Sequence, residues 1–448
     1  MSSSQPSVGL KARIDELIAD FPEHQPRPAG AELALQGIRI VDFTHYIAGP
    51  FATTILADMG AEVVKIEAPQ RGDDFRQYPP MEPAFEGGAP FVWCNRNKRS
   101  IALNLKSPEG LAAARALIAK ADVVVENFST GVMKRLGLDY ESCLIDNPRL
   151  IFCSVSAYGR DGRFADRLGF DPIAQAESGF ISMNGYPDRE GVRALSPVMD
   201  ISTAMMACNA ILGALFARTR TGKGQSVEVA LFDNAVLMTG YAPLQQLFSG
   251  KEPVRPGNTS PDSCPSGVFY AQDRPFLINS GNTQIFRRLV TQVVGLPHLA
   301  SDPAYATNKD RLERREEVFA MLQEVFGREP WSHWQERLRE AGIPCGVLRT
   351  VAEAIRSPEA RERALVTRVP HPELGWVPNV SLPIRYSDTP LADPVLAPRI
   401  GEHTNRVLVD WLNLDEASIR SMAEAGAFGA NATPDGSDTT AALQSSNC

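Results

Sequence analysis

Three aspartates, Asp171, Asp188 and Asp200, stand among glycines and prolines in one stretch of this 448-residue chain. Carboxylates beside Gly and Pro lie on turns, where a side chain can face a ligand while the backbone approaches it closely. Such a carboxylate can act as a nucleophile, an acid or a base. From spacing alone, Asp188 in GYPDREG fits a surface turn, and Asp200 fits the N-cap of an apolar helix predicted over 202–220.

Cations form a second group of candidates. Arg96, Lys98 and Arg99 lie together in NRNKRS, and Lys106 and Arg135 follow further along the chain. Their positions near predicted strand ends and helix starts suit phosphate binding. An ordinary solvated basic face is the alternative.

His45 follows the first predicted strand and could act as an acid or base, with a purely structural histidine as the alternative. The chain has six histidines, and none pairs with a second one at metal-ligand spacing, so the sequence predicts no metal site. Neither a Gly-x-Ser-x-Gly elbow nor a His near a Cys occurs, which gives Ser and Cys nucleophiles little support.

Short apolar runs alternate with helical patterns, which predicts right-handed βαβ units and a parallel sheet. Strands are expected at 38–43, 62–67, 100–105, 122–128, 150–155 and 226–231, with helices at 51–59, 111–121 and 131–144. Ser107 should cap the 111–121 helix and Pro108 should begin it. Ligands bind such sheets at the carboxyl ends of the strands. The chain has neither GxGxxG after the first strand nor a P-loop motif, so a standard dinucleotide or P-loop site is not supported.

The predicted fold class is α/β, with a Rossmann-like parallel-sheet large domain and a smaller α+β domain. The first part of the large domain is expected at 31–220, the small domain at 221–335 and the return to the large domain at 336–428. Residues 429–448 are polar with few apolar anchors, which predicts a disordered tail.

The composition of the chain limits the classes of partner that it is expected to bind. Acidic residues outnumber basic ones, 53 against 45, so no global charge attracts nucleic acid or an anionic membrane. Seven scattered cysteines without a CxxC pair indicate reduced thiols and a cytoplasmic location. The start of the chain lacks a signal-peptide pattern, and we expect no apolar run of membrane-spanning length.

Several blocks together resemble the class III CoA-transferases, of the formyl-CoA transferase and carnitine CoA-transferase type. They include GIRIVDFTHYIAGPFATTILADMGAEVVKIE, NRNKRSIALNLKSPEG, DVVVENFSTGVMKRLGL, RTRTGKGQSVEVAL and GIPCGVL, in matching order between Gly37 and Phe428. The resemblance implies a two-domain subunit, an interlinked homodimer of ring-like chains, and an enzyme that takes an acyl-CoA and a small carboxylic acid.

By the same motifs, the resemblance assigns CoA binding to Tyr46, Ala48, Leu103, Lys106, Asn127, Phe128, Arg135 and Tyr158, and we add the cations Arg71, Lys98 and Arg99. Two positions depart from formyl-CoA transferases. Ala68 stands where they have an arginine, so that Arg71 or Arg76 would have to replace it, and Ser156 stands where they have a lysine.

The resemblance also makes Asp188 the expected nucleophile. A carboxylate can attack a thioester to give a mixed anhydride and CoA thiolate, and the thiolate can attack back to give an aspartyl-CoA thioester. An acceptor acid then repeats both steps in reverse, and succinyl-CoA is one candidate donor. Backbone N–H groups of the Ser280-Gly281-Asn282 segment are the candidate oxyanion donors.

Two alternatives stay open. A second branch of the superfamily, resembling α-methylacyl-CoA racemase, moves an α-proton with a His and an Asp. Its Asp matches Asp200, but its His position is Phe170 here, which disfavours racemisation. The third reading is a CoA-binding protein without turnover.

Overall fold

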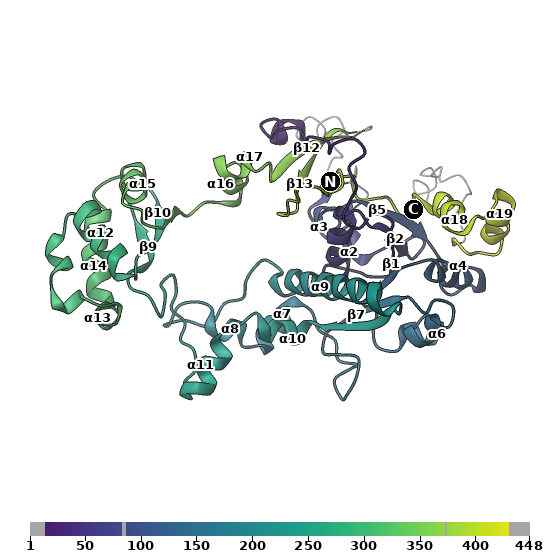
Figure 1. The fold of residues 1–448 in the computed structure, drawn as a ribbon, viewed down its shortest axis with the longest axis horizontal. Coiled ribbons are helices and arrows are strands. Elements are labelled where there is room, and N and C mark those ends of the chain that lie inside the picture. The colour runs from purple at the N-terminus through teal and green to yellow at the C-terminus, as the bar shows by residue number, and fades with distance from the viewer. Residues whose placement is uncertain (1–13, 83–86, 372–373, 430–448) are drawn as a thin grey trace, which may run out of the picture. The chain divides into compact units, whose positions relative to one another are not determined.

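The computed structural model describes residues 14–82, 87–371 and 374–429, and it divides the chain into two compact units (Figure 1). The large unit comprises Met1–Ser178, Ala194–Met238 and Glu359–Cys448, and the second unit comprises Gly179–Arg193 and Thr239–Pro358.

A six-stranded, entirely parallel sheet forms the centre of the large unit. Its strand order is β5 (Lys98–Ala102), β2 (Glu62–Glu67), β1 (Arg39–Asp42), β6 (Val123–Glu126), β7 (Ile151–Ser156) and β8 (Gln225–Ala230). The predicted α/β class with a parallel sheet is confirmed.

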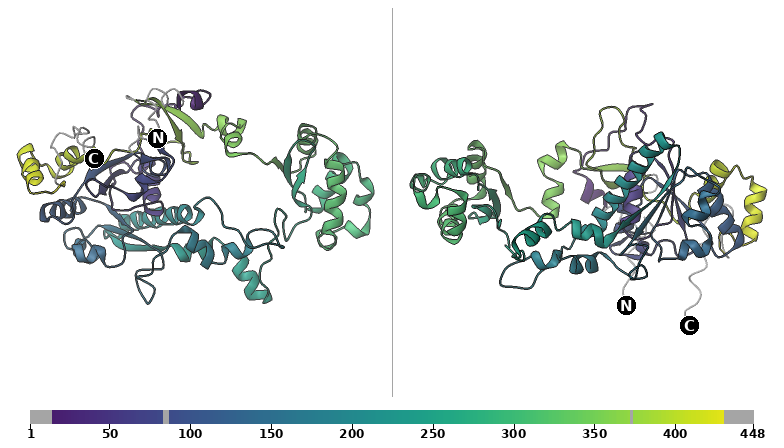
Figure 2. Two further views of the ribbon diagram at one scale, coloured as in Figure 1. Left: turned by 180° about the vertical axis from the view of Figure 1, so that it is seen from behind. Right: turned by 60° about the horizontal axis from the view of Figure 1, so that its bottom comes forward.

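Helices cover both faces of this sheet (Figure 2). Alternate residues of β1 serve opposite faces: Ile40 packs with α2 (Ala48–Asp58) and α9 (Val198–Thr221), and Val41 packs on the other side. That side holds α4 (Pro108–Ala119), α18 (Thr404–Leu412) and α19 (Glu416–Glu424). Burial on both faces explains why the central strand β6, with the sequence VVVE, is almost entirely apolar.

Shorter elements complete the large unit. They are β3 (Met81–Glu82), β4 (Gly87–Gly88), α3 (Ala89–Trp93), α5 (Val132–Leu136), α6 (Tyr140–Leu144), α7 (Asp171–Glu177), α10 (Leu231–Leu237), β12 (Val366–His371) and β13 (Gly375–Val380), with α17 (Pro358–Glu362) at the boundary. The single helix expected over 131–144 is two helices, because Gly137 adopts φ +65° and ends the first. Ser107 caps α4 as predicted, accepting the Gly110 N–H at 3.1 Å.

The long helix α9 corrects two expectations. It begins at Val198 after the N-cap Pro197, so Asp200 lies in its first turn and is not its N-cap. Its 24 residues are also long and apolar enough to cross a membrane, so the expectation that no apolar run reaches that length was wrong. Ala204, Ala207 and Ile211 are fully buried in the core, as in a core helix of a folded domain.

The second unit is α+β. Its antiparallel sheet has the order β11 (Cys345–Val347), β10 (Pro275–Asn279), β9 (Ser266–Tyr270). Its helices are α8 (Phe180–Met183), α11 (Ala242–Ser249), α12 (Thr283–Arg288), α13 (Asn308–Glu313), α14 (Arg315–Phe326), α15 (Trp331–Glu340) and α16 (Val351–Ile355). Phe269, Phe276 and Phe326 pack together in its core.

The unit boundaries differ from the expected 220/221 and 335/336. Because β8 pairs with β7, the chain stays in the large unit as far as Met238. Because β11 pairs with β10, the second unit continues to Pro358. Residues 430–448 of the expected disordered tail lie outside the described residues.

Candidate functional site

A cavity of about 430 Å³ lies within the large unit, where β1, β6 and β7 end. We call it the sheet-edge cavity. Its walls are His45, Tyr46, Ile47, Ala48, Asn127, Phe128, Ser129, Thr130, Val155, Ser156, Ala157, Arg160, Ala165, Asp166, Arg167, Leu168, Gly169, Phe170, Asp200 and Leu231. This position is the one expected for a ligand on a parallel sheet.

The turn between β1 and α2 forms one wall. Thr44 donates both its N–H and its hydroxyl to Asp42, at 2.8 and 2.5 Å. A Cβ on Gly49 would stand 2.3 Å from the Thr44 side chain, so only glycine lets the helix start this close to the strand. The tight turn directs His45, Tyr46 and the following residues to the cavity.

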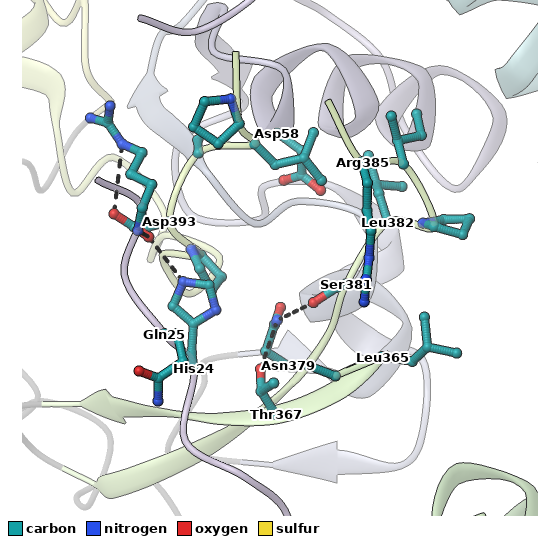
Figure 3. Close-up of a pocket in the computed structure, with 18 of the residues that line it drawn as sticks. His24, Gln25, Asp58, Leu365, Thr367, Asn379, Ser381, Leu382, Arg385 and Asp393 are labelled. Atoms are coloured by element: carbon teal, nitrogen blue, oxygen red, sulfur yellow. Dashed lines mark hydrogen bonds and ion pairs between the residues drawn. The ribbon is translucent and has the colours of Figure 1, made fainter. Parts of the chain in front are cut away.

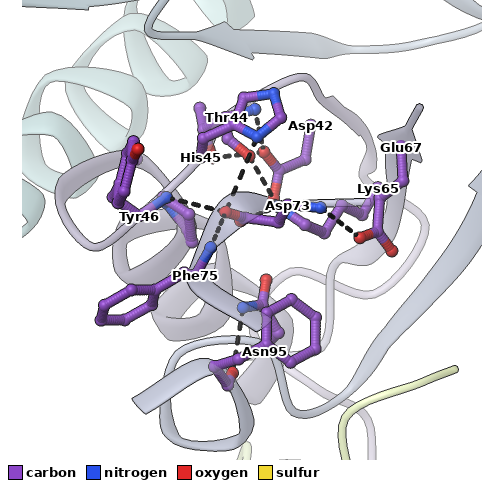
Figure 4. Close-up of polar contacts among 12 residues, drawn as sticks. Asp42, Thr44, His45, Tyr46, Lys65, Glu67, Asp73, Phe75 and Asn95 are labelled. Atoms are coloured by element: carbon purple, nitrogen blue, oxygen red, sulfur yellow. Dashed lines mark hydrogen bonds and ion pairs between the residues drawn. The ribbon is translucent and has the colours of Figure 1, made fainter. Parts of the chain in front are cut away.

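A network of buried charged residues contacts this turn and stabilises it (Figure 4). Asp73 accepts the N–H groups of Tyr46 and Phe75, at 3.2 and 3.0 Å, and its other oxygen lies 3.0 Å from the Lys65 ammonium. The His45 Nδ1 lies 3.6 Å from Asp73. Burial is the largest influence and opposes ionisation of Asp73, but Lys65, His45 and the Phe75 N–H together outweigh it and hold the pKa of this carboxyl well below its ordinary value. Asp73 therefore stays an anion.

Asn127 ties the end of β6 to the same turn. Its side-chain oxygen accepts the His45 N–H at 2.9 Å, and its amide donates to the His45 carbonyl at 2.8 Å. The Phe128 ring lies 5.6 Å from the His45 ring, centroid to centroid. Two residues expected to bind CoA, Asn127 and Phe128, thus shape the wall together with His45.

Asp200 supplies a carboxyl group to the cavity from the first turn of α9. Asp171, the first residue of α7, accepts the backbone N–H groups of Met199 and Asp200, at 2.7 and 3.3 Å. Burial, and then the negative charge of Asp171, raise the pKa of Asp200 to about 7. A carboxyl with this pKa is partly ionised at neutral pH and is more basic than an ordinary aspartate.

The expected nucleophile Asp188, unlike Asp200, does not lie in the wall of the sheet-edge cavity. Asp188 belongs to the second unit, its side chain is 73% exposed, and Arg189 is an ion-pair partner at 3.9 Å. Its role as nucleophile stays a prediction.

The expected CoA-binding residues fall into two groups. Tyr46, Ala48, Asn127 and Phe128 line the sheet-edge cavity. Tyr158 stands beside the wall residue Ala157, and its hydroxyl donates to Glu177 at 2.7 Å.

The remaining candidates do not line the cavity. Lys106 and Arg135 are exposed, and so is Arg71, which pairs with Asp74 at 2.6 Å. Leu103 is buried in the core beneath α4. Arg99 pairs with Glu62 and Asp410.

The contacts of Lys98 contradict the expectation that it binds a phosphate. It is fully buried, and its ammonium donates to Asp42, the Pro50 carbonyl and Asn95, at 3.0, 2.8 and 2.9 Å. These three partners take all three of its N–H groups. Lys98 therefore stabilises the β1–α2 turn from inside.

Sequence reasoning did not select Arg160, Arg167 or Phe170 as wall residues. Arg160 donates to the Phe128 carbonyl at 2.6 Å and to Glu126 at 2.8 Å, which links the ends of β6 and β7. Its place directly after Tyr158-Gly159 was the available signal. The Ser280-Gly281-Asn282 segment also differs from expectation, since Ser280 and Gly281 are buried and Arg311 donates to the Gly281 carbonyl.

A second cavity of the large unit, of about 520 Å³, borders the β12–β13 hairpin (Figure 3). We call it the hairpin cavity. Its carboxylates already have cationic partners: Asp58 binds Arg96 at 2.5 Å, and Asp393 lies 3.6 Å from the Arg27 guanidinium. The sheet-edge cavity, in which Asp200 has no cationic partner among the described residues, is the better candidate active site.

Comparison with known proteins agrees with this geometry. The chain matches the family described as CoA-transferase family III over residues 35–404. Acetyl-CoA:oxalate CoA-transferase of Acetobacter aceti is 39% identical over 345 residues, which cover 76% of this chain and 87% of that protein. Succinate–glutarate CoA-transferase of Agrobacterium fabrum is 36% identical over 411 residues, which cover 90% and 100%.

A solved structure shows the same fold. The crystal structure of a CAIB/BAIF family protein from Brucella suis aligns with a TM-score of 0.76 at 35% identity, covering 85% of this chain and 100% of that one. The resemblance to class III CoA-transferases is thereby confirmed, and the chain belongs to CoA-transferase family III.

Proposed function

We propose that this acyl-CoA:carboxylate CoA-transferase moves CoA from succinyl-CoA, or a similar acyl-CoA, to a small dicarboxylic acid in the sheet-edge cavity. The observation that carries the proposal is the Asp200 carboxyl, which lines this cavity together with four of the residues expected to bind CoA. The names of the relatives, which pair acetyl-CoA with oxalate and succinate with glutarate, support this substrate class.

In the proposed mechanism an ionised oxygen of Asp200 attacks the thioester carbonyl of the donor. Asp188, the nucleophile that the family motif predicts, is the alternative for the same step. A C–O bond forms, the C–S bond breaks, and CoA leaves as a thiolate with the electron pair. The thiolate attacks the aspartyl carbonyl of the mixed anhydride and expels the donor acid as a carboxylate. An aspartyl-CoA thioester remains on the enzyme.

The acceptor acid completes the cycle. Its carboxylate attacks the aspartyl-CoA thioester and releases the thiolate, which then attacks the acceptor's acyl carbonyl. The new acyl-CoA leaves and the carboxylate of Asp200 is restored, so no other reactant is needed. The pKa of about 7 supports this role, since a more basic carboxylate is a better nucleophile while still partly ionised at neutral pH.

Charged groups of the cavity wall suit the anionic substrates. Arg160 and Arg167 line the cavity and could bind the carboxylate of an acceptor or a phosphate of CoA. The exposed cations Arg71, Lys106 and Arg135 stay candidates for the more distant phosphates. We also propose the interlinked homodimer that is typical of this family.

The decisive experiment compares Asp200→Ala with Asp188→Ala in the full-length protein. CoA transfer from succinyl-CoA to glutarate and oxalate is followed by mass spectrometry, and the enzyme ester is trapped with hydroxylamine. We expect Asp200→Ala to lose activity by at least about 10³-fold and to form no adduct, with CoA binding retained. Loss of the adduct only in Asp188→Ala would transfer the role to Asp188.

An α-methylacyl-CoA epimerase is the second candidate, because it would also use Asp200. Phe170 lines the same cavity in place of the second proton-transfer group, which argues against it. Exchange of the substrate α-proton with deuterated water in the absence of an acceptor acid would favour this candidate.

A further inference from the structure

The hairpin cavity is lined mainly by residues within the family match of 35–404, and a segment outside that match, Pro22 to Arg27, supplies part of its wall. The segment around Glu23 pairs with β12: the His24 N–H donates to the Arg368 carbonyl, and the Arg368 N–H donates to the Pro22 carbonyl, both at 2.9 Å. This isolated β-bridge holds His24 at the cavity wall. The cavity is therefore an ordered feature of this chain.

Hydrogen-bond donors predominate on its polar wall. Asn379, which is 7% exposed, donates to the hydroxyls of Thr367 and Ser381 at 3.2 and 3.1 Å (Figure 3). Both hydroxyls act only as acceptors in these bonds, so their own protons have no partner among the described residues. Two O–H donors thus remain for a ligand.

The acids of the wall are already satisfied. Asp58 accepts from Arg96 and from Asn97, and Asp393 accepts from the Arg27 N–H and lies close to His24. Glu23 pairs with Arg368 at 2.8 Å. None of these carboxylates needs a cation from solution.

Two arginines of the wall, Arg363 and Arg385, have no carboxylate partner among the described residues. Arg385 donates to the Arg363 carbonyl at 2.5 Å, which holds its guanidinium near that residue. Leu365, Leu382 and Ile384 supply apolar surface to the same cavity. A volume of about 520 Å³ is in the range of small-molecule sites.

We propose that the hairpin cavity binds a small organic carboxylate with an apolar carbon chain, at a site separate from the sheet-edge cavity. Free guanidinium and hydroxyl donors match a carboxylate head, and an arginine fork matches its planar geometry. The apolar residues match the chain of the ligand. This site could let the enzyme respond to an acid that is not its substrate, and it does not depend on the proposed mechanism.

Calorimetric titration of the full-length protein with hexanoate tests the proposal, with neutral hexanamide and hexyl phosphate as comparison ligands. We expect one saturable site for hexanoate and none for hexanamide. Arg385→Gln should raise the Kd by about 10-fold, and the double variant Arg363→Gln/Arg385→Gln should abolish binding. The exposed Arg420→Gln is the matched control and should bind normally.

The variant Asp200→Asn tests whether hexanoate binds in the hairpin cavity or in the sheet-edge cavity. Unchanged hexanoate binding in this variant supports a separate site, and loss of binding there would overturn the proposal. Absence of saturation up to about 10 mM, a weak-binding limit, would also overturn it. Tighter binding of hexyl phosphate than of hexanoate would reject the carboxylate assignment.

Discussion

Asp171 accepts the backbone N–H of Asp200 at 3.3 Å, and after burial, the larger cause, its negative charge contributes to raising the pKa of Asp200 to about 7. The same carboxylate thus orders the first turn of α9 and makes its neighbour more basic. This relationship joins the fold to the proposed chemistry, because both aspartates depend on how α7 packs beside α9.

The first prediction concerns the pH dependence of activity. A nucleophilic Asp200 must be ionised, so kcat/KM should rise as the pH increases through about 7. Asp171→Asn removes the like charge and should move the midpoint down by about one pH unit. Steady-state kinetics between pH 5 and 9 measures this.

Asp166→Asn is the control, because Asp166 also lines the sheet-edge cavity but is not a cause of the raised pKa. The pH midpoint of kcat/KM in this variant should equal that of the wild type. An equal midpoint in Asp171→Asn and wild type would contradict the assignment of the coupling.

The second prediction concerns stability. The pKa of Asp200 is about 7 in the folded state and about 3.9 in an unfolded chain. Its contribution to stability is therefore complete below about pH 4 and is lost as the pH rises through about 7. Between pH 5 and 8 this loss should be about 2–3 kcal/mol of unfolding free energy.

Asp200→Asn cannot titrate and should lack this loss. Urea unfolding of both proteins at pH 5 and pH 8 measures this. The free energy of unfolding of the variant should increase relative to that of the wild type as the pH rises. Parallel pH dependence of the two proteins would show that Asp200 is not buried in the folded protein as described.

The third prediction concerns the bridge between β6 and the β1–α2 turn. Asn127→Ala removes both hydrogen bonds to the His45 backbone, so the turn should loosen and the KM for acyl-CoA should rise by about 10-fold. The free energy of unfolding should fall by about 1–2 kcal/mol.

Asn147 offers a matched control in the same unit. It also donates to backbone carbonyls, those of Ile118 and Ala121, but it is not a wall residue of the cavity. Asn147→Ala should lose similar stability with an unchanged KM. Equal KM changes in the two variants would mean that Asn127 has no special role at the cavity.

The sequence by itself determined the parallel α/β architecture and the edge of the sheet at which a ligand would bind. Strand 62–67 was predicted at its observed bounds, and Ser107 and Pro108 begin α4 as expected, because these signals are local. Apolar strands, helix caps and glycine stops each act within a few residues. The wall residues Tyr46, Asn127 and Phe128 followed from the ends of such strands together with the family motifs.

Only the tertiary structure decided which charged groups reach the cavity. Lys98 is indistinguishable from a phosphate ligand in NRNKRS, yet β5 carries it into the interior, where Asp42 neutralises it. Asp200 was indistinguishable from a helix cap until α7 brought Asp171 beside it. Burial and the distance between charges come from contacts between residues far apart in the chain, and local spacing carries no record of them.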